Sequence, residues 1–496
     1  MLRELLLSYP RLFSTIQLAC AARRLNRWAL VVTLTLVASQ ATAGSLYLPV
    51  KLSPEIESAV ERLFVAADMP LIKRPIPVKL VQLAITKAAD KDPQLANSVG
   101  RYLERYAEQA GSTHSSLRVS LNDGVDAILP NERGFSTDSS YVVSSAGYLV
   151  LNDYIALNLG AVAGDRSFGD DLYLEGTFAS LGWDAFQVDL GWRSHWWGPT
   201  QEGAMLLSSQ APAMPGITLS NVEPFKLLGF SYELFMVQMS ESDKIESAAN
   251  PSVKVTGKPR AFGVMLAVQP FDGFAAAFNR ILQYGGGDRP DGLGDVFDAY
   301  FSPRKEDNVG VVGKDFGNQV TSFTTSFTFP GKKPFSIYME YAGEDSSAPT
   351  KQHLGNTALT FGIHLPYLTK NLDLSYEYTD WQNGWYTNAN YGDGLTNEGV
   401  LIGHWALTTR ELQPSVPGKA HWLGAIWTTE SGNTLSLDYR HVEHNNLDGV
   451  YDFDPIDQLQ LEYARAFGAL IGGVTLTTGN DAWGDSYSQI SGFIRW

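Results

Sequence analysis

A tryptophan-rich stretch in the first half of the chain carries the side chains best suited to chemistry. Residues 191–208, which we call the tryptophan segment, contain five candidates: Arg193, His195, Trp196, Trp197 and Glu202. Indole rings can stack on the C–H faces of pyranose rings, while arginine, histidine and glutamate can hydrogen-bond to sugar hydroxyls. The same residues can also form a packed plug that binds nothing, because large apolar side chains fill interiors. The segment therefore predicts either a glycan contact or a closed interior.

A second aromatic group lies between residues 381 and 405. Trp385, Tyr386 and Tyr391 are further candidates for glycan contact. Trp381 and Trp405 flank them, and we expect these two rings to join an aromatic girdle at a lipid interface, where amphipathic rings are enriched. The region is thus predicted to hold rings that meet sugar and rings that meet lipid.

The sequence offers no recognisable catalytic or metal-binding motif. It contains no H-E-x-x-H, no G-x-S-x-G, no P-loop and no cysteine-based metal site. His441 and His444 are three residues apart, a spacing that places them on opposite faces of a strand. Asp288, Asp291 and Asp295 do not have the spacing of an EF-hand loop. We therefore expect no enzyme activity, no cofactor and no metal ion.

The elements that must position these segments are predicted to be β-strands. In residues 372–378, leucine and tyrosine occupy every second position and alternate with Asp373, Ser375 and Glu377. Such strands, joined alternately by short turns and long external loops, are typical of outer-membrane barrels. Long loops are expected in four ranges: 283–320, 342–355, 381–419 and 444–455. We predict an all-β transmembrane barrel of about 18 antiparallel strands, with the tryptophan segment folded from the external side into its lumen.

Composition excludes several other classes. Of 496 residues, 44% are hydrophobic and 18% are charged. No apolar run of about 20 residues follows residue 43, so a helical membrane protein is excluded. The formal net charge is −16. Because residues 1–43 hold five arginines and one glutamate, the remaining chain carries −20. A surface this acidic repels phosphate backbones, and nucleic-acid binding is not expected.

The N-terminus has the pattern of a secretory signal peptide. Arg23, Arg24 and Arg27 precede an apolar run over 29–38, and a small-residue cleavage site of the A-x-A type ends at Ala43. Cleavage there would also remove the only cysteine, which suits an oxidising compartment. We therefore expect the mature chain to be exported.

The rest of the chain divides in two. Three stretches with apolar residues at helical spacing, separated by prolines, precede the strands. We assign residues 1–43 to the signal peptide, 44–111 to a small periplasmic three-helix bundle and 112–496 to the barrel. The last strand ends on Trp496, and a terminal aromatic residue is the signal by which insertion machinery recognises barrels of the Gram-negative outer membrane. Phenylalanine is the usual residue there. Contact with outer-membrane lipid follows from this assignment.

The tryptophan segment also resembles a signature of the Wzi family of capsule-assembly proteins. The resemblance begins at Trp196-Trp197-Gly198-Pro199 and extends to Leu207-Ser208. Further matches occur in order at 283–286, 317–319, 341–345 and 399–404. This resemblance implies a barrel plugged by its helical bundle below and by loops above. It also implies a lectin-like role, without catalysis, in which the protein holds exported capsular or extracellular polysaccharide at the cell surface.

Two other functions compete with this hypothesis. A passive porin or sugar-uptake channel would need an open aqueous path through the barrel. An outer-membrane enzyme acting on lipid A would need a serine–histidine pair or clustered carboxylates near the rim, and the sequence gives no such set. We therefore expect a polysaccharide-attachment protein, with a channel as the main alternative.

Overall fold

The computed structural model describes residues 46–50, 52–124, 139–165, 171–301, 316–346, 354–407, 416–445 and 453–496. The expected signal peptide, residues 1–43, lies outside these ranges. Among the described residues, no helix is both long enough and apolar enough to cross a bilayer.

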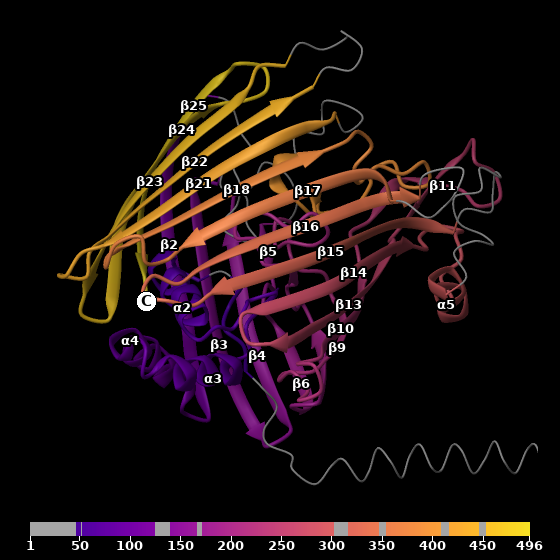
Figure 1. Cartoon of the computed structure of the whole chain (residues 1–496). Coiled ribbons are helices and arrows are strands. Elements are labelled where there is room, and N and C mark those ends of the chain that lie inside the picture. The colour runs from indigo at the N-terminus through magenta and orange to yellow at the C-terminus, as the bar shows by residue number, and fades with distance from the viewer. Residues whose placement is uncertain are drawn as a thin grey trace, which may run out of the picture.

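The described strands form one closed antiparallel barrel (Figure 1). Its strands in chain order are β2 (Ala110–Gly124), β3 (Tyr141–Asn152), β4 (Ile155–Gly164), β5 (Leu172–Tyr173), β6 (Phe178–Trp183), β7 (Phe186–Gly191), β9 (Gly216–Ser220), β10 (Ser231–Gln238), β13 (Arg260–Phe271), β14 (Phe274–Tyr284), β15 (Gly317–Phe329), β16 (Phe335–Ser346), β17 (Leu354–Leu365), β18 (Leu372–Trp381), β21 (Gly418–Thr428), β22 (Thr434–His444), β23 (Ile456–Phe467), β24 (Leu470–Asn480) and β25 (Ser486–Arg495). Both β5 and β6 pair with β4, so they share one position in the wall. Pairing of β25 with β2 closes the ring. The described residues thus form the 18 antiparallel strands that the sequence predicts.

The two faces of each strand follow the predicted alternation. In β18, Asp373, Ser375 and Glu377 are buried towards the lumen. On the opposite face of the wall, Trp427, Leu435 and Tyr463 are register partners on three neighbouring strands, and all three are exposed. An exposed aromatic and aliphatic band is the surface that a barrel presents to lipid.

Three helices precede the barrel: α2 (Pro54–Ala66), α3 (Val78–Ala88) and α4 (Pro93–Leu103). Proline stands at the start of α2 and of α4, where its missing N–H costs nothing. The Asp92 side chain caps α4 by accepting a hydrogen bond from the Leu95 N–H at 3.0 Å. Apolar residues of all three helices form one core. Figure 1 shows this bundle at the end of the barrel where the C-terminus lies. Its periplasmic location stays a prediction.

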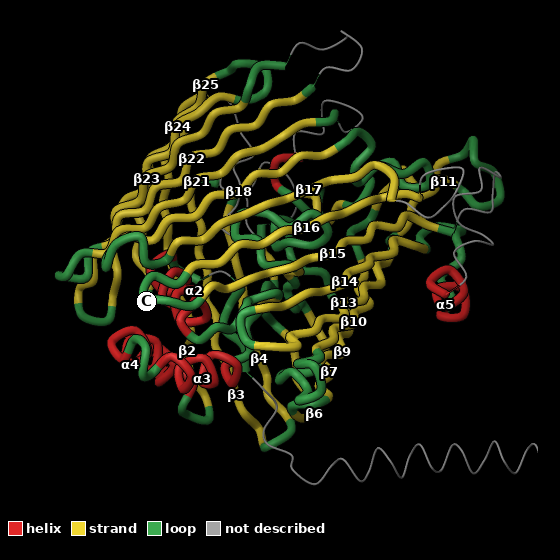
Figure 2. Tube along the Cα trace, viewed as in Figure 1, coloured by secondary structure: helices red, strands yellow, loops and turns green. Residues whose placement is uncertain are grey.

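Smaller elements complete the described structure. They are β1 (Lys73–Arg74), β8 (Trp196–Trp197), β11 (Ser242–Glu246), β12 (Lys254–Gly257), β19 (Thr396–Asn397), β20 (Val400–Leu401), the helix α5 (Leu293–Phe301) and two short 3-10 helices (Glu104–Tyr106 and Trp405–Leu407). Figure 2 shows loop segments inside the ring of strands. The tryptophan segment bonds to an inward-facing side chain of the wall, Glu233. The fold therefore places the candidate residues within the barrel.

Polar contacts attach α2 to the barrel wall. The guanidinium of Arg495, on the last strand, donates to Glu55 at 2.6 Å and to Glu462 at 2.9 Å. The Ser58 hydroxyl donates to the Asp373 carboxylate at 2.8 Å. Since these groups are largely buried, each contact is worth more than an exposed ion pair. The bundle is thus fastened to the barrel by directional bonds.

Arg495→Ala is expected to loosen the bundle. The change removes charge-assisted bonds to two carboxylates and should lower the free energy of unfolding by about 2–3 kcal/mol. Limited proteolysis of the folded protein in detergent should then cut the helices faster than the strands. Lys370→Ala is the control, because the Lys370–Glu430 pair is 76% and 84% exposed and contributes little. Equal cleavage in both variants would show that Arg495 does not hold the bundle.

Candidate functional site

The tryptophan segment lies inside the barrel and pairs with the N-terminal region. Strand β8 is antiparallel to β1, with Trp197 opposite Lys73 and Trp196 opposite Arg74. Both indole side chains are buried. Phe235 on β10 packs against Trp197, with a ring-centroid distance of 5.0 Å. The segment therefore connects the bundle side of the chain to the inner wall.

A buried carboxylate gathers four side chains of this region. Glu233 on β10 is 0% exposed. It accepts hydrogen bonds from Arg193 at 2.9 Å and from the Trp197 indole at 2.8 Å, and its carboxylate lies 3.6 Å from the Lys73 ammonium. His195 Nδ1 lies 2.9 Å from the same carboxylate, which can only accept, so the imidazole donates. Glu233 thereby fixes the tryptophan segment in the lumen.

Burial also changes the pKa values of the groups around Glu233. It lowers the pKa of the Lys73 ammonium, and the negative charge of Glu233 acts in the opposite direction. It lowers the pKa of His195, again against the hydrogen bond to Glu233. A neutral imidazole that donates through Nδ1 serves as a structural hydrogen-bonding group. We assign His195 that role.

Inward-facing side chains on three further strands hold the rest of the segment. Glu377 on β18 accepts the backbone N–H of Gln201 at 2.5 Å and of Glu202 at 3.1 Å. Glu340 on β16 accepts the Met205 N–H at 2.8 Å. The guanidinium of Arg440 on β22 donates to the Glu202 carboxylate. The segment therefore crosses the lumen from β10 to β22.

The second aromatic group packs on the first. Trp385, Tyr386 and Tyr391 are buried, and the Tyr386 hydroxyl donates to the carbonyl oxygen of Met205 in the tryptophan segment. The Tyr386 oxygen also accepts the backbone N–H of His404 at 2.9 Å. Burial lowers the pKa of the His404 imidazole to about 3, so this ring is neutral. The two segments form one interior.

The expectation of an aromatic girdle for Trp381 and Trp405 is wrong. Both rings belong to the buried apolar cluster that contains Trp197 and Trp385. Trp381 ends β18 with the same parity as Asp373, which is the inward face of that strand. Its indole N–H donates to the Val416 carbonyl at 2.9 Å. These rings therefore pack inside the protein and do not face lipid.

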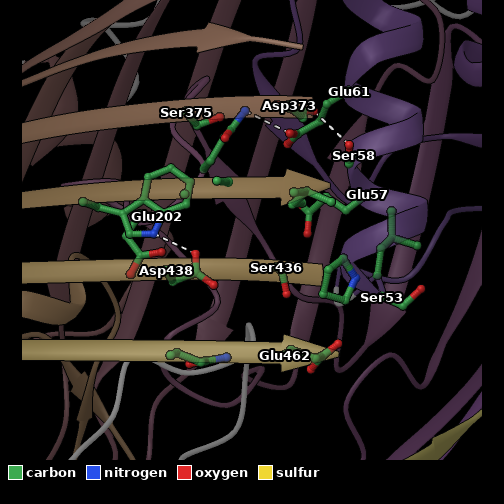
Figure 3. A pocket seen from close by; sticks show the side chains of 18 of the residues that line it. Ser53, Glu57, Ser58, Glu61, Glu202, Asp373, Ser375, Ser436, Asp438 and Glu462 are labelled. Carbon is green, nitrogen blue, oxygen red and sulfur yellow. Dashed lines mark hydrogen bonds between the residues drawn. The ribbon is translucent and has the colours of Figure 1, made fainter. Parts of the chain in front are cut away.

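Seven of the eight candidate glycan-contact residues are buried, and the exception is Glu202. Direct contact with sugar stays a prediction for all eight. Glu202 lines a cavity of about 210 Å³ between α2 and the inner wall (Figure 3). Carboxylate, guanidinium and hydroxyl groups from α2 and five strands surround it, among them Glu57, Asp438 and Ser436. Of the eight candidates, Glu202 alone lines the cavity.

Sequence reasoning did not find this cavity or the carboxylates that anchor the tryptophan segment. Glu233, Glu340 and Glu377 stand far from that segment in the chain and carry no motif. The sequence did contain one signal for them, the alternation of residues along each strand. Each of these glutamates stands at a position that faces the lumen, on a strand whose outward positions are apolar. A buried carboxylate must have partners.

In the part of the chain that the structure describes, the His, Cys, Asp and Glu side chains form no group of three arranged to hold a metal ion. His441 instead contacts Asp457 at 2.9 Å and Glu443 at 3.1 Å. Asp288 accepts from the Ser247 hydroxyl at 2.6 Å, and Asp291 pairs with Arg260 at 3.0 Å. These carboxylates engage protein groups on different elements.

Comparison with known proteins identifies the family. A family model described as capsule assembly protein Wzi matches residues 109–472. The chain belongs to this family. It is therefore an outer-membrane β-barrel of the Wzi type, as the resemblance of the tryptophan segment implies. The matched range runs from just before β2 to the beginning of β24, and the bundle precedes it.

A solved structure supports the same fold. Wzi of Escherichia coli, described as an outer-membrane protein involved in group 1 capsule assembly and as a carbohydrate-binding β-barrel, is 14% identical. The match covers 92% of this chain and 99% of that one, with a TM-score of 0.67. OccK3 (OpdO) of Pseudomonas aeruginosa is 10% identical and gives a TM-score of 0.47 over 81% of this chain and 98% of that chain.

A curated relative matches a smaller part of the chain. An uncharacterised 55.8 kDa protein from the cps region of Klebsiella pneumoniae is 26% identical over 169 residues. The aligned part is 32% of this chain and 31% of that relative. The chain therefore spans about a third of the relative's length in this match, which adds similarity without transferring a role.

Proposed function

We propose that this protein attaches exported capsular or extracellular polysaccharide to the cell surface, as a plugged, carbohydrate-binding barrel. Family membership over residues 109–472 carries the proposal. The similarity in fold to a carbohydrate-binding barrel, which extends over 92% of the chain, supports it. The role requires binding without chemistry, so no catalytic group is assigned.

The segments that pack inside the barrel support attachment over transport. The tryptophan segment bonds to inner-wall residues on β10, β16, β18 and β22. Apolar residues of that segment and of residues 385–407 pack with several strands in one cluster. A wide aqueous path, which a porin needs, would have to pass beside these segments. A channel is therefore the alternative that measurement must address.

The orientation belongs to the same proposal. We place the bundle in the periplasm and the long loops outside, with residues 1–43 as the signal peptide. Trp496 closes the barrel sheet by exchanging backbone hydrogen bonds with Ser115 at 2.9 and 3.3 Å. An aromatic residue at that edge is where barrel-insertion machinery would engage the last strand, and outer-membrane lipid would contact the exposed apolar band.

A deletion strain tests the attachment role. Without the protein, we expect total polysaccharide to stay constant while its cell-bound fraction falls and the fraction released into the medium rises. The plasmid-borne gene should restore the bound fraction. Polysaccharide measured separately in washed cells and medium gives the result. Normal retention in the deletion strain would refute the proposal.

A further inference from the structure

The 210 Å³ cavity between α2 and the inner wall has the size of a ligand site. A water molecule needs about 10–15 Å³ of such space, so the cavity has room for roughly fifteen waters, the scale of one or two pyranose rings. Its inner-wall lining comes from seven strands, namely β2, β3, β18, β21, β22, β23 and β25. Residues of the apolar luminal cluster do not line it. The polar side of the lumen is thus left hollow where the opposite side is packed.

Polar side chains that can pair with a ligand line this space. Ser375 and Ser436 are each 5% exposed and line the cavity (Figure 3). The amide of Gln460, which is partly exposed, lines it as well. Hydroxyl and amide groups can both donate and accept hydrogen bonds. These three groups can therefore bond to water or to a bound molecule.

The charges of the lining do not suit an acidic ligand. Each cavity guanidinium already has a carboxylate: Arg440 binds Glu202, Arg495 binds Glu462 at 2.9 Å, and Arg118 lies 3.8 Å from Glu462. The lining contains six carboxylates and three arginines. A carboxylate or phosphate on the ligand would meet excess negative charge without a free cation.

Aromatic surface completes the lining. Trp422 on β21 donates its indole N–H to the Asp438 carboxylate at 3.0 Å, and Phe493 on β25 lies along the same cavity. Carboxylates accept hydrogen bonds from hydroxyl groups, and aromatic rings pack on C–H surfaces. Hydroxyls, carboxylates and rings together match a neutral sugar.

We infer that this cavity, at the bundle end of the lumen, binds an uncharged sugar residue of the exported polysaccharide. The inference rests on the proposed function and adds to it a site and a ligand class. Sugar hydroxyls donate to carboxylates such as Asp438 and exchange hydrogen bonds with Ser375, Ser436 and Gln460. Of the candidates in the tryptophan segment, Glu202 lines this site.

Calorimetry on the full mature protein in detergent tests the site. The probes are neutral trisaccharides of glucose, galactose and mannose, with trigalacturonate as the acidic counterpart of the galactose compound. We expect at least one neutral probe to bind and trigalacturonate to bind at least tenfold more weakly. Equal or tighter binding of trigalacturonate would overturn the ligand class. Binding of native polysaccharide but of none of the neutral probes would overturn the cavity as the site.

A matched pair of variants locates the binding. Ser436→Leu fills the cavity and should weaken neutral-sugar binding at least tenfold. Ser488→Leu makes the same change on the exposed face of β25 and should bind as the unaltered protein does. Heat-dependent mobility in gels reports folding, and Ser436→Val replaces Ser436→Leu if the larger side chain prevents folding.

Unchanged binding in the folded Ser436 variant refutes the cavity as the binding site, even if the deletion strain still releases its polysaccharide. Normal retention in that strain refutes attachment, whatever the cavity binds.

Discussion

Glu233→Ala is expected to lower the free energy of unfolding by about 3–5 kcal/mol, because it breaks a buried charge network from its centre. Lys73 would lose the carboxylate that compensates its burial, and Arg193 would keep only its contact with Asp189 at 3.3 Å. The indole of Trp197 and the imidazole of His195 would lose their acceptor. The loss should appear as a lower melting temperature in detergent and as new protease cleavage within the tryptophan segment.

Two companion variants separate charge from shape. Glu233→Gln keeps an acceptor for Trp197 while removing the charge, so we expect a loss between that of the alanine variant and none. Trp197→Ala removes a fully buried ring that packs on Phe235 and should cost about 3–5 kcal/mol, mainly through folding. Melting of Glu233→Ala at the temperature of the unaltered protein would show that the network does not stabilise the barrel. A folded Trp197→Ala variant with polysaccharide retention lost would instead assign that ring to binding.

The strand framework was predictable because a membrane barrel imposes a strict rule on sequence. Each wall residue faces either lipid or lumen, so apolar and polar residues alternate along every strand. Strand β18 begins at Leu372, where the predicted alternation begins.

The packing of the interior was predicted only in part. The apolar character of the tryptophan segment predicted that it lies inside the barrel. It did not predict which residues bind the segment, because Glu233 stands 36 residues after Trp197 and their contact depends on strand register. Parity would have placed Trp381 inward, because it shares the face of Asp373 and Glu377. A girdle assignment based on residue type alone ignored that parity. The cavity was not predictable, because its lining is assembled from α2 and seven strands, and each supplies only a few residues.

Removing the tryptophan segment is expected to convert a closed barrel into a channel. Gly191 at the end of β7 and Gly216 at the start of β9 are register partners, so a short glycine-rich turn can replace residues 192–215 without moving the strands. The inward carboxylates Glu340 and Glu377 would then line a hydrated passage. In planar bilayers the variant should give sustained conductance steps, and the full chain should give none.

A second deletion of similar size makes the comparison specific. Gln238 and Arg260 are also register partners, so a turn can replace residues 239–259, which include β11 and β12. This variant keeps the tryptophan segment and should stay closed, because the contacts of that segment with Glu233, Glu340 and Glu377 remain. Sustained steps from the full chain would contradict the plugged barrel and favour the channel. Steps from the control alone would assign closure to the β11–β12 region.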